Sequence, residues 1–385
     1  MEIKAYVTSF LSRMKNTQEK ILSFLDSDQN REEDLQVLLR YFQDQKICED
    51  KVEFKALLHL ISKISNNYHR STNFICKIEQ ILKNLQEKTK NYFSNYDIFH
   101  IFKNNKRILL FLFEEKVIIP DKSILSQMTK HKFKFREYIP YFYPEFESFF
   151  DDQLKQEIKS QLPEDMNLFE QKRKIGQNDS EICRLIRNDS IDDFIKFVNQ
   201  NNYPLDYEIE KSIYETNNYL TYCFPTLIEY SAFFGSVKIF KYLITNGANL
   251  GASLMSFSSH GNNSEIIHIL EEKQIEIADF DYYESIKCHS IDVSNYLKQK
   301  LNDVNGCSQC LHYYNFIELE NQINDFGFNF FYDCCRYDYI SIVDFLLKNS
   351  KIEINSKVTS NISFNFLNDA SIFFNFFVNR ISLNF

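Results

Sequence analysis

Cysteine and histidine occur close together in one short segment, Cys307-Ser-Gln-Cys310-Leu-His312. A CxxC pair with a nearby histidine has the residue types that bind zinc, whose structural sites need four convergent ligands. The chain has no second CxxC pair, and no two histidines are spaced as a zinc-binding pair. We therefore treat Cys307, Cys310 and His312 as candidate metal ligands only. We favour separate reduced thiols without a metal or other cofactor.

Motifs for phosphate binding and nucleophilic catalysis are missing from the sequence. No two of the seven glycines have the GxG spacing of a dinucleotide loop, and no P-loop is present. Gly247 and Gly251 are four apart but enclose no serine, so the usual hydrolase elbow is absent. Cys288 and His289 are adjacent, and on a helix their side chains would diverge. We predict a protein that is not an enzyme, with an enzyme of unrecognised site as the alternative.

Composition narrows the class of protein further. A hydrophobic fraction of 44% with 25% charged residues is typical of folded chains. The net charge of −9 argues against nucleic-acid binding, which needs basic surface. Only 7 glycines and 6 prolines in 385 residues favour long helices. The sequence has no secretory leader and no apolar run long enough for membrane insertion. With nine scattered cysteines, we expect an intracellular, cytoplasmic protein.

Amphipathic helix patterns fill the first part of the chain and predict an α-helical N-terminal region over residues 1–94. Two stripes have the spacing of one helical face: Leu57, Leu60, Ile61 and Ile64, and then Phe74, Ile78, Ile81, Leu82 and Leu85. We expect a further helix over Asp34–Phe42 and a loop at residues 28–30. The aromatic segment Tyr141–Phe150 is interpreted as a core-packed connector, with a docking site as the alternative.

Residues 226–250 have the pattern of a helical hairpin. A first helix is predicted over Leu227–Phe233, and Gly235 permits a tight reversal. Ser236 is expected to cap the second helix, and Gly247 stands where a left-handed C-cap belongs.

This hairpin resembles an ankyrin repeat, whose signature is T-P-L-H-x-A-A-x-x-G-H, a second helix and L-L-x-x-G-A-D. Six residues match in register: Thr226, Ala232, Gly235, Leu243, Gly247 and Ala248. The sequence departs from the signature at Leu227, Glu229 and Ser231, which replace its Pro, His and first Ala.

Weaker copies of the second-helix pattern recur along the chain. One begins 27 residues after Gly235, at Asn262, and another begins 27 residues later, at His289 (262 − 235 and 289 − 262). Further copies begin at Asn104, Asp189 and Asp338. A 27-residue period is shorter than the usual 33-residue ankyrin repeat, so we expect hairpins without the β-hairpin finger.

Residues 95–355 resemble an ankyrin-like family of unknown function that is expanded in parasitic protists. The likeness is carried by residues 98–112, 285–297 and 331–355. It implies an all-α, ankyrin-like solenoid of stacked helical hairpins, in which 95–355 is a degenerate repeat array. It also implies a non-catalytic protein-protein interaction module, a scaffold or adaptor whose partner is another protein.

The repeat pattern stops after residue 355. Residues 356–385 are rich in Phe and Asn without amphipathic order, and we expect a divergent, poorly ordered tail. We predict a truncated or frame-shifted family member, or an incomplete gene model. A truncated member without independent function is therefore a further alternative.

Overall fold

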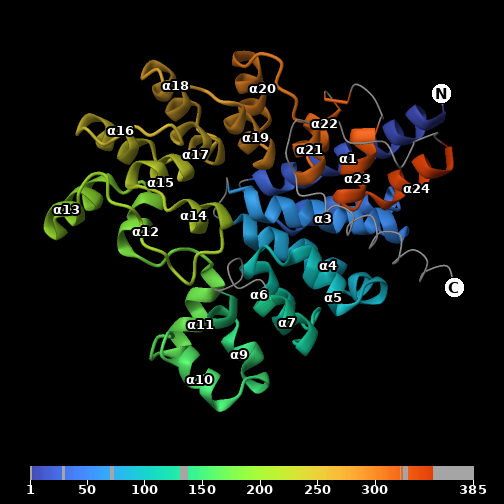
Figure 1. Cartoon of the computed structure of the whole chain (residues 1–385), viewed down its shortest axis with the longest axis horizontal. Coiled ribbons are helices and arrows are strands. Elements are labelled where there is room, and N and C mark those ends of the chain that lie inside the picture. Colours follow the sequence, from blue (N-terminus) through green and yellow to red (C-terminus); the bar gives the residue numbers. More distant parts are fainter. Residues whose placement is uncertain are drawn as a thin grey trace.

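A computed structural model describes residues 2–27, 31–69, 73–130, 138–320, 322–323 and 328–349. Within these ranges the protein is all-α, as predicted, with an isolated Glu208–Thr226 bridge and no β-strand (Figure 1). None of the helices described is long and apolar enough to cross a membrane. The loop expected at residues 28–30 and the tail 356–385 lie outside the described residues.

The first half of the chain forms a group of helices in which α3 packs against α4 and α5, and α6 against α11. The two apolar stripes predicted on α3 and α4 are buried, and so are most aromatic rings of the predicted connector Tyr141–Phe150. The elements are α1 (Glu2–Asp26), α2 (Glu32–Asp44), α3 (Lys51–Asn67), α4 (Phe74–Tyr92), α5 (Asn95–Phe102), α6 (Lys106–Glu114), α7 (Lys122–Lys130), α8 (Tyr138–Tyr141), α9 (Tyr143–Phe146), the 3₁₀ helix η1 (Glu147–Phe149), α10 (Asp152–Lys159) and α11 (Met166–Ile175).

In the second half, the described residues form six helical hairpins and one single helix, α14 (Asn218–Cys223). The first helices of the hairpins pack side by side in chain order, and Figure 1 shows them as one row. The hairpins are α12 (Glu181–Arg187) with α13 (Ile191–Asn201), α15 (Leu227–Phe234) with α16 (Val237–Thr245), α17 (Leu254–Gly261) with α18 (Ser264–Glu272), α19 (Asp279–Lys287) with α20 (Ile291–Lys300), α21 (Cys307–Tyr313) with α22 (Phe316–Leu319), and α23 (Phe328–Arg336) with α24 (Ile340–Asn349).

One left-handed residue reverses the chain in every hairpin. These residues are Asp189, Gly235, Asn262, His289, Tyr314 and Asp338, with φ between 45° and 69°. In five hairpins the next amide donates to the carbonyl five residues earlier, which satisfies an orphan carbonyl at the end of the first helix. Five of the six residues begin a predicted second-helix pattern. The sixth, the turn at Tyr314, was not predicted from the sequence. Asn104 was also predicted to begin such a pattern, but its backbone is not left-handed.

In the second, fourth and fifth hairpins, the residue after the turn ties the hairpin to the preceding one. The Ser236 hydroxyl donates to the Ile186 carbonyl (2.6 Å), and the Ser290 hydroxyl to the Ser259 carbonyl (3.1 Å). Asn315 repeats this contact, donating to the Ile286 carbonyl (2.9 Å). Ser236 stands at the N-cap of α16, as predicted, but its hydroxyl makes no capping hydrogen bond there and instead donates to a carbonyl at the end of the neighbouring hairpin's first helix.

Gly261 permits the close approach of α15 and α17. A Cβ at Gly261 would lie 2.3 Å from the Ala232 carbonyl oxygen and 2.9 Å from the Gly235 nitrogen. Both obstacles are backbone atoms, so only glycine fits without a shift of one helix against the other.

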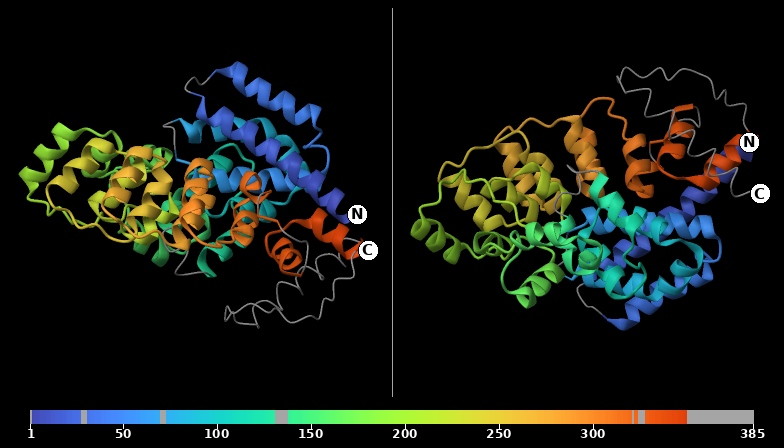
Figure 2. Two further views of the ribbon diagram at one scale, coloured as in Figure 1. Left: turned by 90° about the horizontal axis from the view of Figure 1, so that it is seen from above. Right: turned by 60° about the horizontal axis from the view of Figure 1, so that its bottom comes forward.

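The N-terminal helices pack against the turns of the last three hairpins, which we name the turn edge. Gln18 on α1 is fully buried there and contacts the turns of the fourth and fifth hairpins. On α3, Lys55 and His59 pair with Asp338 in the turn of the sixth hairpin. Tyr6 stacks on Phe345 with ring centroids 3.9 Å apart. The views in Figure 2 agree that α1 lies beside α24.

Gly261→Ala tests the close packing of α15 against α17. We expect the free energy of unfolding to fall by about 2 kcal/mol, because the added methyl group must displace backbone. Urea denaturation of the full chain measures it. Gly251→Ala is the matched control, since its Cβ would meet Ser253 at 3.4 Å, an ordinary contact. Equal free energies of unfolding for the two variants would contradict a need for glycine at position 261.

Candidate functional site

The predicted metal ligands on α21 do not converge. Cys310 is fully buried, Cys307 is half-buried, and His312 stacks on Tyr337 with ring centroids 4.6 Å apart. Among the described residues, the group whose donor atoms do converge is a different one, formed by His260, Glu284 and Cys288. All nine cysteines lie outside disulfides, as predicted, and six of them are buried.

The six residues of the repeat signature support the local fold. Thr226 is the N-cap of α15 and forms a capping box with Glu229. Gly235 and Gly247 are left-handed, with φ of 66° and 88°, as predicted for both. The remaining three, Ala232, Leu243 and Ala248, are buried. These side chains and turns shape one hairpin and offer little surface to a partner.

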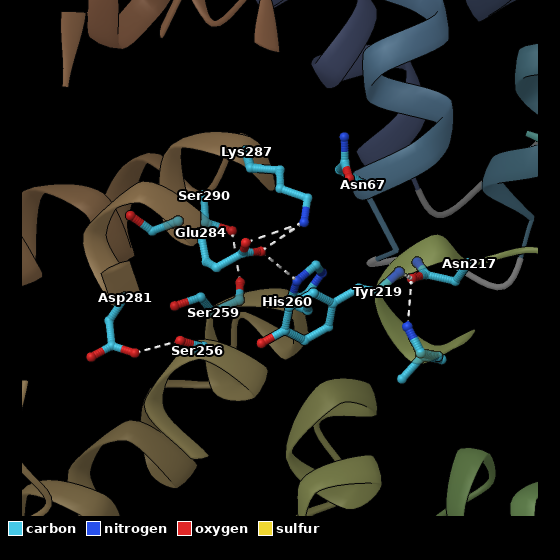
Figure 3. Close-up of polar contacts among 12 residues, drawn as sticks. Asn67, Asn217, Tyr219, Ser256, Ser259, His260, Asp281, Glu284, Lys287 and Ser290 are labelled. Atoms are coloured by element: carbon cyan, nitrogen blue, oxygen red, sulfur yellow. Dashed lines mark hydrogen bonds and ion pairs between the residues drawn. The ribbon is translucent and has the colours of Figure 1, made fainter. Parts of the chain in front are cut away.

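A buried polar cluster lies where α17 meets α19 (Figure 3). The His260 Nε2 atom is 3.2 Å from Glu284 Oε2. The Lys287 ammonium lies 3.2 and 3.0 Å from the two oxygens of the same carboxylate. His260 comes from α17 and the other two residues from α19, so the cluster links neighbouring hairpins.

Aromatic rings fix the orientation of His260. Its imidazole stacks on Tyr219 and on Phe233, with centroid distances of 4.5 and 4.6 Å. The Lys287 ammonium lies 4.8 Å above the Tyr219 ring, a cation–π contact. Glu284 is thus the polar partner toward which the fixed His260 ring presents Nε2.

Burial and pairing set the charges in the cluster. Burial lowers the pKa of His260 below its ordinary 6.5, so the imidazole is neutral at neutral pH. Burial alone would raise the pKa of Glu284. The hydrogen bond from His260 and the charge of Lys287 outweigh it, and the pKa of Glu284 lies below its ordinary 4.5. Glu284 also raises the pKa of Lys287 against the effect of burial. The cluster therefore holds a carboxylate–ammonium pair beside a neutral imidazole.

Cys288 brings a third type of donor atom to this cluster. Its sulfur, a Glu284 oxygen and a His260 ring nitrogen all lie within 4.8 Å of one another, and all three residues are buried. Cys288 is the C-cap residue of α19 and follows Glu284 by four residues, which places both on one helical face. That spacing is visible in the sequence, whereas His260 is joined to it only by the packing of two hairpins.

A small cavity of about 40 Å³ lies nearby, between the end of α3 and the segment that leads into α14. Polar residues of its lining include Ser65, His69 and Glu215. A volume of this size holds roughly two or three water molecules. The cavity is therefore too small for an ordinary enzyme substrate.

Glu284→Gln tests the buried ion pair. Removing the carboxylate charge leaves the Lys287 ammonium unpaired, and its side chain is only 17% exposed. We expect the free energy of unfolding at pH 7 to fall by about 3 kcal/mol. Because the pKa of folded Glu284 lies below 4.5, the contribution of its charge is complete above pH 4.5 and is lost as the pH falls through the folded-state pKa. The difference from the unmodified chain should therefore shrink only below pH 4.5.

Urea denaturation at several pH values provides the measurement. Glu265→Gln is the control, since Glu265 pairs with Lys241 at the exposed surface. We expect this variant to have the same free energy of unfolding as the unmodified chain. If Glu284→Gln were as stable as this control, the buried pair would have no structural role.

In comparisons with protein-family models, with curated proteins and with solved structures, nothing matches this chain. The resemblance to ankyrin repeats therefore depends on the residues of the repeat itself.

Proposed function

We propose that the protein is a non-catalytic interaction module, an ankyrin-like solenoid that binds another protein along one edge of its hairpin row. The observation that carries the proposal is the recurrence of one turn geometry in six hairpins whose first helices lie side by side. Each such hairpin buries its apolar face against its neighbours, and the row then presents an extended surface.

The turn edge of the last three hairpins is already occupied by α1 and α3. The opposite edge, which we name the connector edge, contains the N-terminal ends of α15, α17 and α19. Contacts between Ser253 and Glu229, and between Ser256 and Asp281, hold these ends beside one another. The connector edge of these three hairpins is therefore the surface that we expect a partner to contact.

Large aromatic side chains are exposed at this edge. Tyr222 and Phe224, just before α15, are 51% and 48% exposed, and Phe280, in the first turn of α19, is 57% exposed. The Lys211 ammonium lies 4.5 Å from the Phe224 ring. Exposed aromatic residues with a neighbouring cation are typical of the residues that dominate protein–protein binding energy. We infer that Phe224 and Phe280 are anchor residues.

An enzyme with an unrecognised site is the alternative function. It requires a pocket for a substrate beside converging polar groups, and the polar cavity between α3 and α14, one cavity in the described part of the chain, has room only for water. We favour the interaction module because one hairpin geometry recurs along the row.

Site-specific photocrosslinking of the full chain tests the proposal. A photoreactive phenylalanine analogue is placed at position 224 or 280, and at Val37 on α2, which is 63% exposed, as a control. In an extract of the native cells, we expect positions 224 and 280 to capture the same polypeptide, and position 37 not to capture it. Phe280→Ser should lower the affinity of the protein for this polypeptide about tenfold or more. Identical products at all three positions, or unchanged affinity of Phe280→Ser, would contradict the proposal.

A further inference from the structure

We propose that His260, Glu284 and Cys288 form a binding site for a thiophilic divalent cation, with Zn²⁺ as the ion it fits best. Imidazole nitrogen, carboxylate oxygen and thiolate sulfur are the three donor types that zinc uses in proteins. This site is independent of the connector edge and of the candidate ligands on α21.

The donor atoms have the spacing that a tetrahedral ion requires. Zinc bonds to these atoms measure about 2.0 to 2.3 Å, so ligands of one tetrahedral ion lie about 3.3 to 3.8 Å apart. His260 Nε2 and Glu284 Oε2 are 3.2 Å apart, and the three donor atoms lie within 4.8 Å of one another. Side-chain adjustments of about one ångström would bring all three to bonding distance.

Two packed helices position the ligands. Glu284 on α19 and its C-cap residue Cys288 lie one turn apart, and His260 lies on α17, which packs against α19. The His260 ring packs against both Tyr219 and Phe233 (Figure 3 shows Tyr219 beside it). Ligands on helices whose rotamers are fixed by packing pre-organise a metal site better than ligands on loops.

Metal binding rearranges the protons of the cluster. A neutral His260 that donates from Nε2 to Glu284 must carry its proton on Nδ1 instead, so that the Nε2 lone pair faces the ion, and Glu284 binds as a carboxylate. On binding, the Cys288 thiol releases its proton to solvent and its sulfur bonds to the ion as thiolate. Zn²⁺ with one carboxylate and one thiolate is neutral overall, which suits a buried position. A tetrahedral ion keeps a fourth position for water.

Lys287 competes with the cation in this site. Its ammonium lies 3.0 and 3.2 Å from the Glu284 oxygens and supplies the positive charge that a metal ion would supply. The Lys287 side chain is partly exposed, so it can swing toward solvent when an ion enters. Zinc affinity is therefore set by exchange of one cation for another at Glu284.

Cobalt(II) titration of the full-length, reduced and chelator-treated protein tests the site. Thiolate bound to Co²⁺ gives a charge-transfer absorption, which excess Zn²⁺ should abolish by displacement. We expect a stoichiometry of one Co²⁺ per chain. The band should be lost in Cys288→Ser, and it should persist in Cys76→Ser, which alters an exposed thiol on α4. Cys310→Ser should also keep the band.

Lys287→Met provides a second variant that leaves all three ligands in place. Without the competing ammonium we expect Co²⁺ affinity to rise about tenfold, with the helical circular-dichroism spectrum unchanged. Absence of the band in the unmodified protein would overturn the proposal. So would a band that survives Cys288→Ser, or an affinity that Lys287→Met leaves unchanged.

Discussion

Gln18 joins the two halves of the protein through a complete set of hydrogen bonds. Its amide nitrogen lies 2.8 Å from His289 Nδ1 and donates to Asn315 Oδ1 at 3.1 Å. Its amide oxygen accepts from the backbone N–H groups of Phe316 and Ile317 at 2.7 and 3.1 Å. A buried glutamine whose groups are all paired fixes one register, since any shift of α1 would leave unpaired polar atoms.

This contact matters because hairpins of a repeat array have little stability alone. The second helix of the fifth hairpin, α22, has four residues, too few for a stable helix by itself. The Gln18 oxygen satisfies two of its first amides, and Lys15 pairs with Glu320 just after its end, at 2.5 Å. Helix α1 thus supplements the Asn315 side chain, which caps α22 by accepting from the Glu318 N–H. Together, α1 and α3 cover the turn edge of the last three hairpins.

The sequence contains the pattern of the hairpins but not the contacts between them. Positions such as Gly235 and Asp338 are predictable because a polar or glycine turn precedes a clear helical stripe. Tyr314 was missed because tyrosine is unusual in a left-handed turn and the helix after it is short. The need for glycine at 261 depends on a carbonyl of another helix, and the role of Gln18 depends on residues about 300 positions away.

The residues of the candidate sites also differ in how far the sequence predicts them. Glu284 and Cys288 share a helical face that periodicity can reveal, whereas the exposure of Phe280 is seen only in the structure. The addition of His260 to the cluster required the packing of α17 on α19, and no spacing in the sequence encodes it. Conversely, Cys307 and Cys310 have a spacing typical of metal sites, yet only one of these two thiols is buried.

Hydrogen exchange in Gln18→Ala, followed by mass spectrometry, tests most directly whether α1 holds the last hairpins in place. Gln36→Ala, an exposed substitution on α2, is the control. If α1 stabilises the turn edge, amide exchange should increase in α22 and α24 while α15 and α17 keep their protection. Unchanged exchange in α22, or an equal increase throughout the hairpin row, would contradict this account.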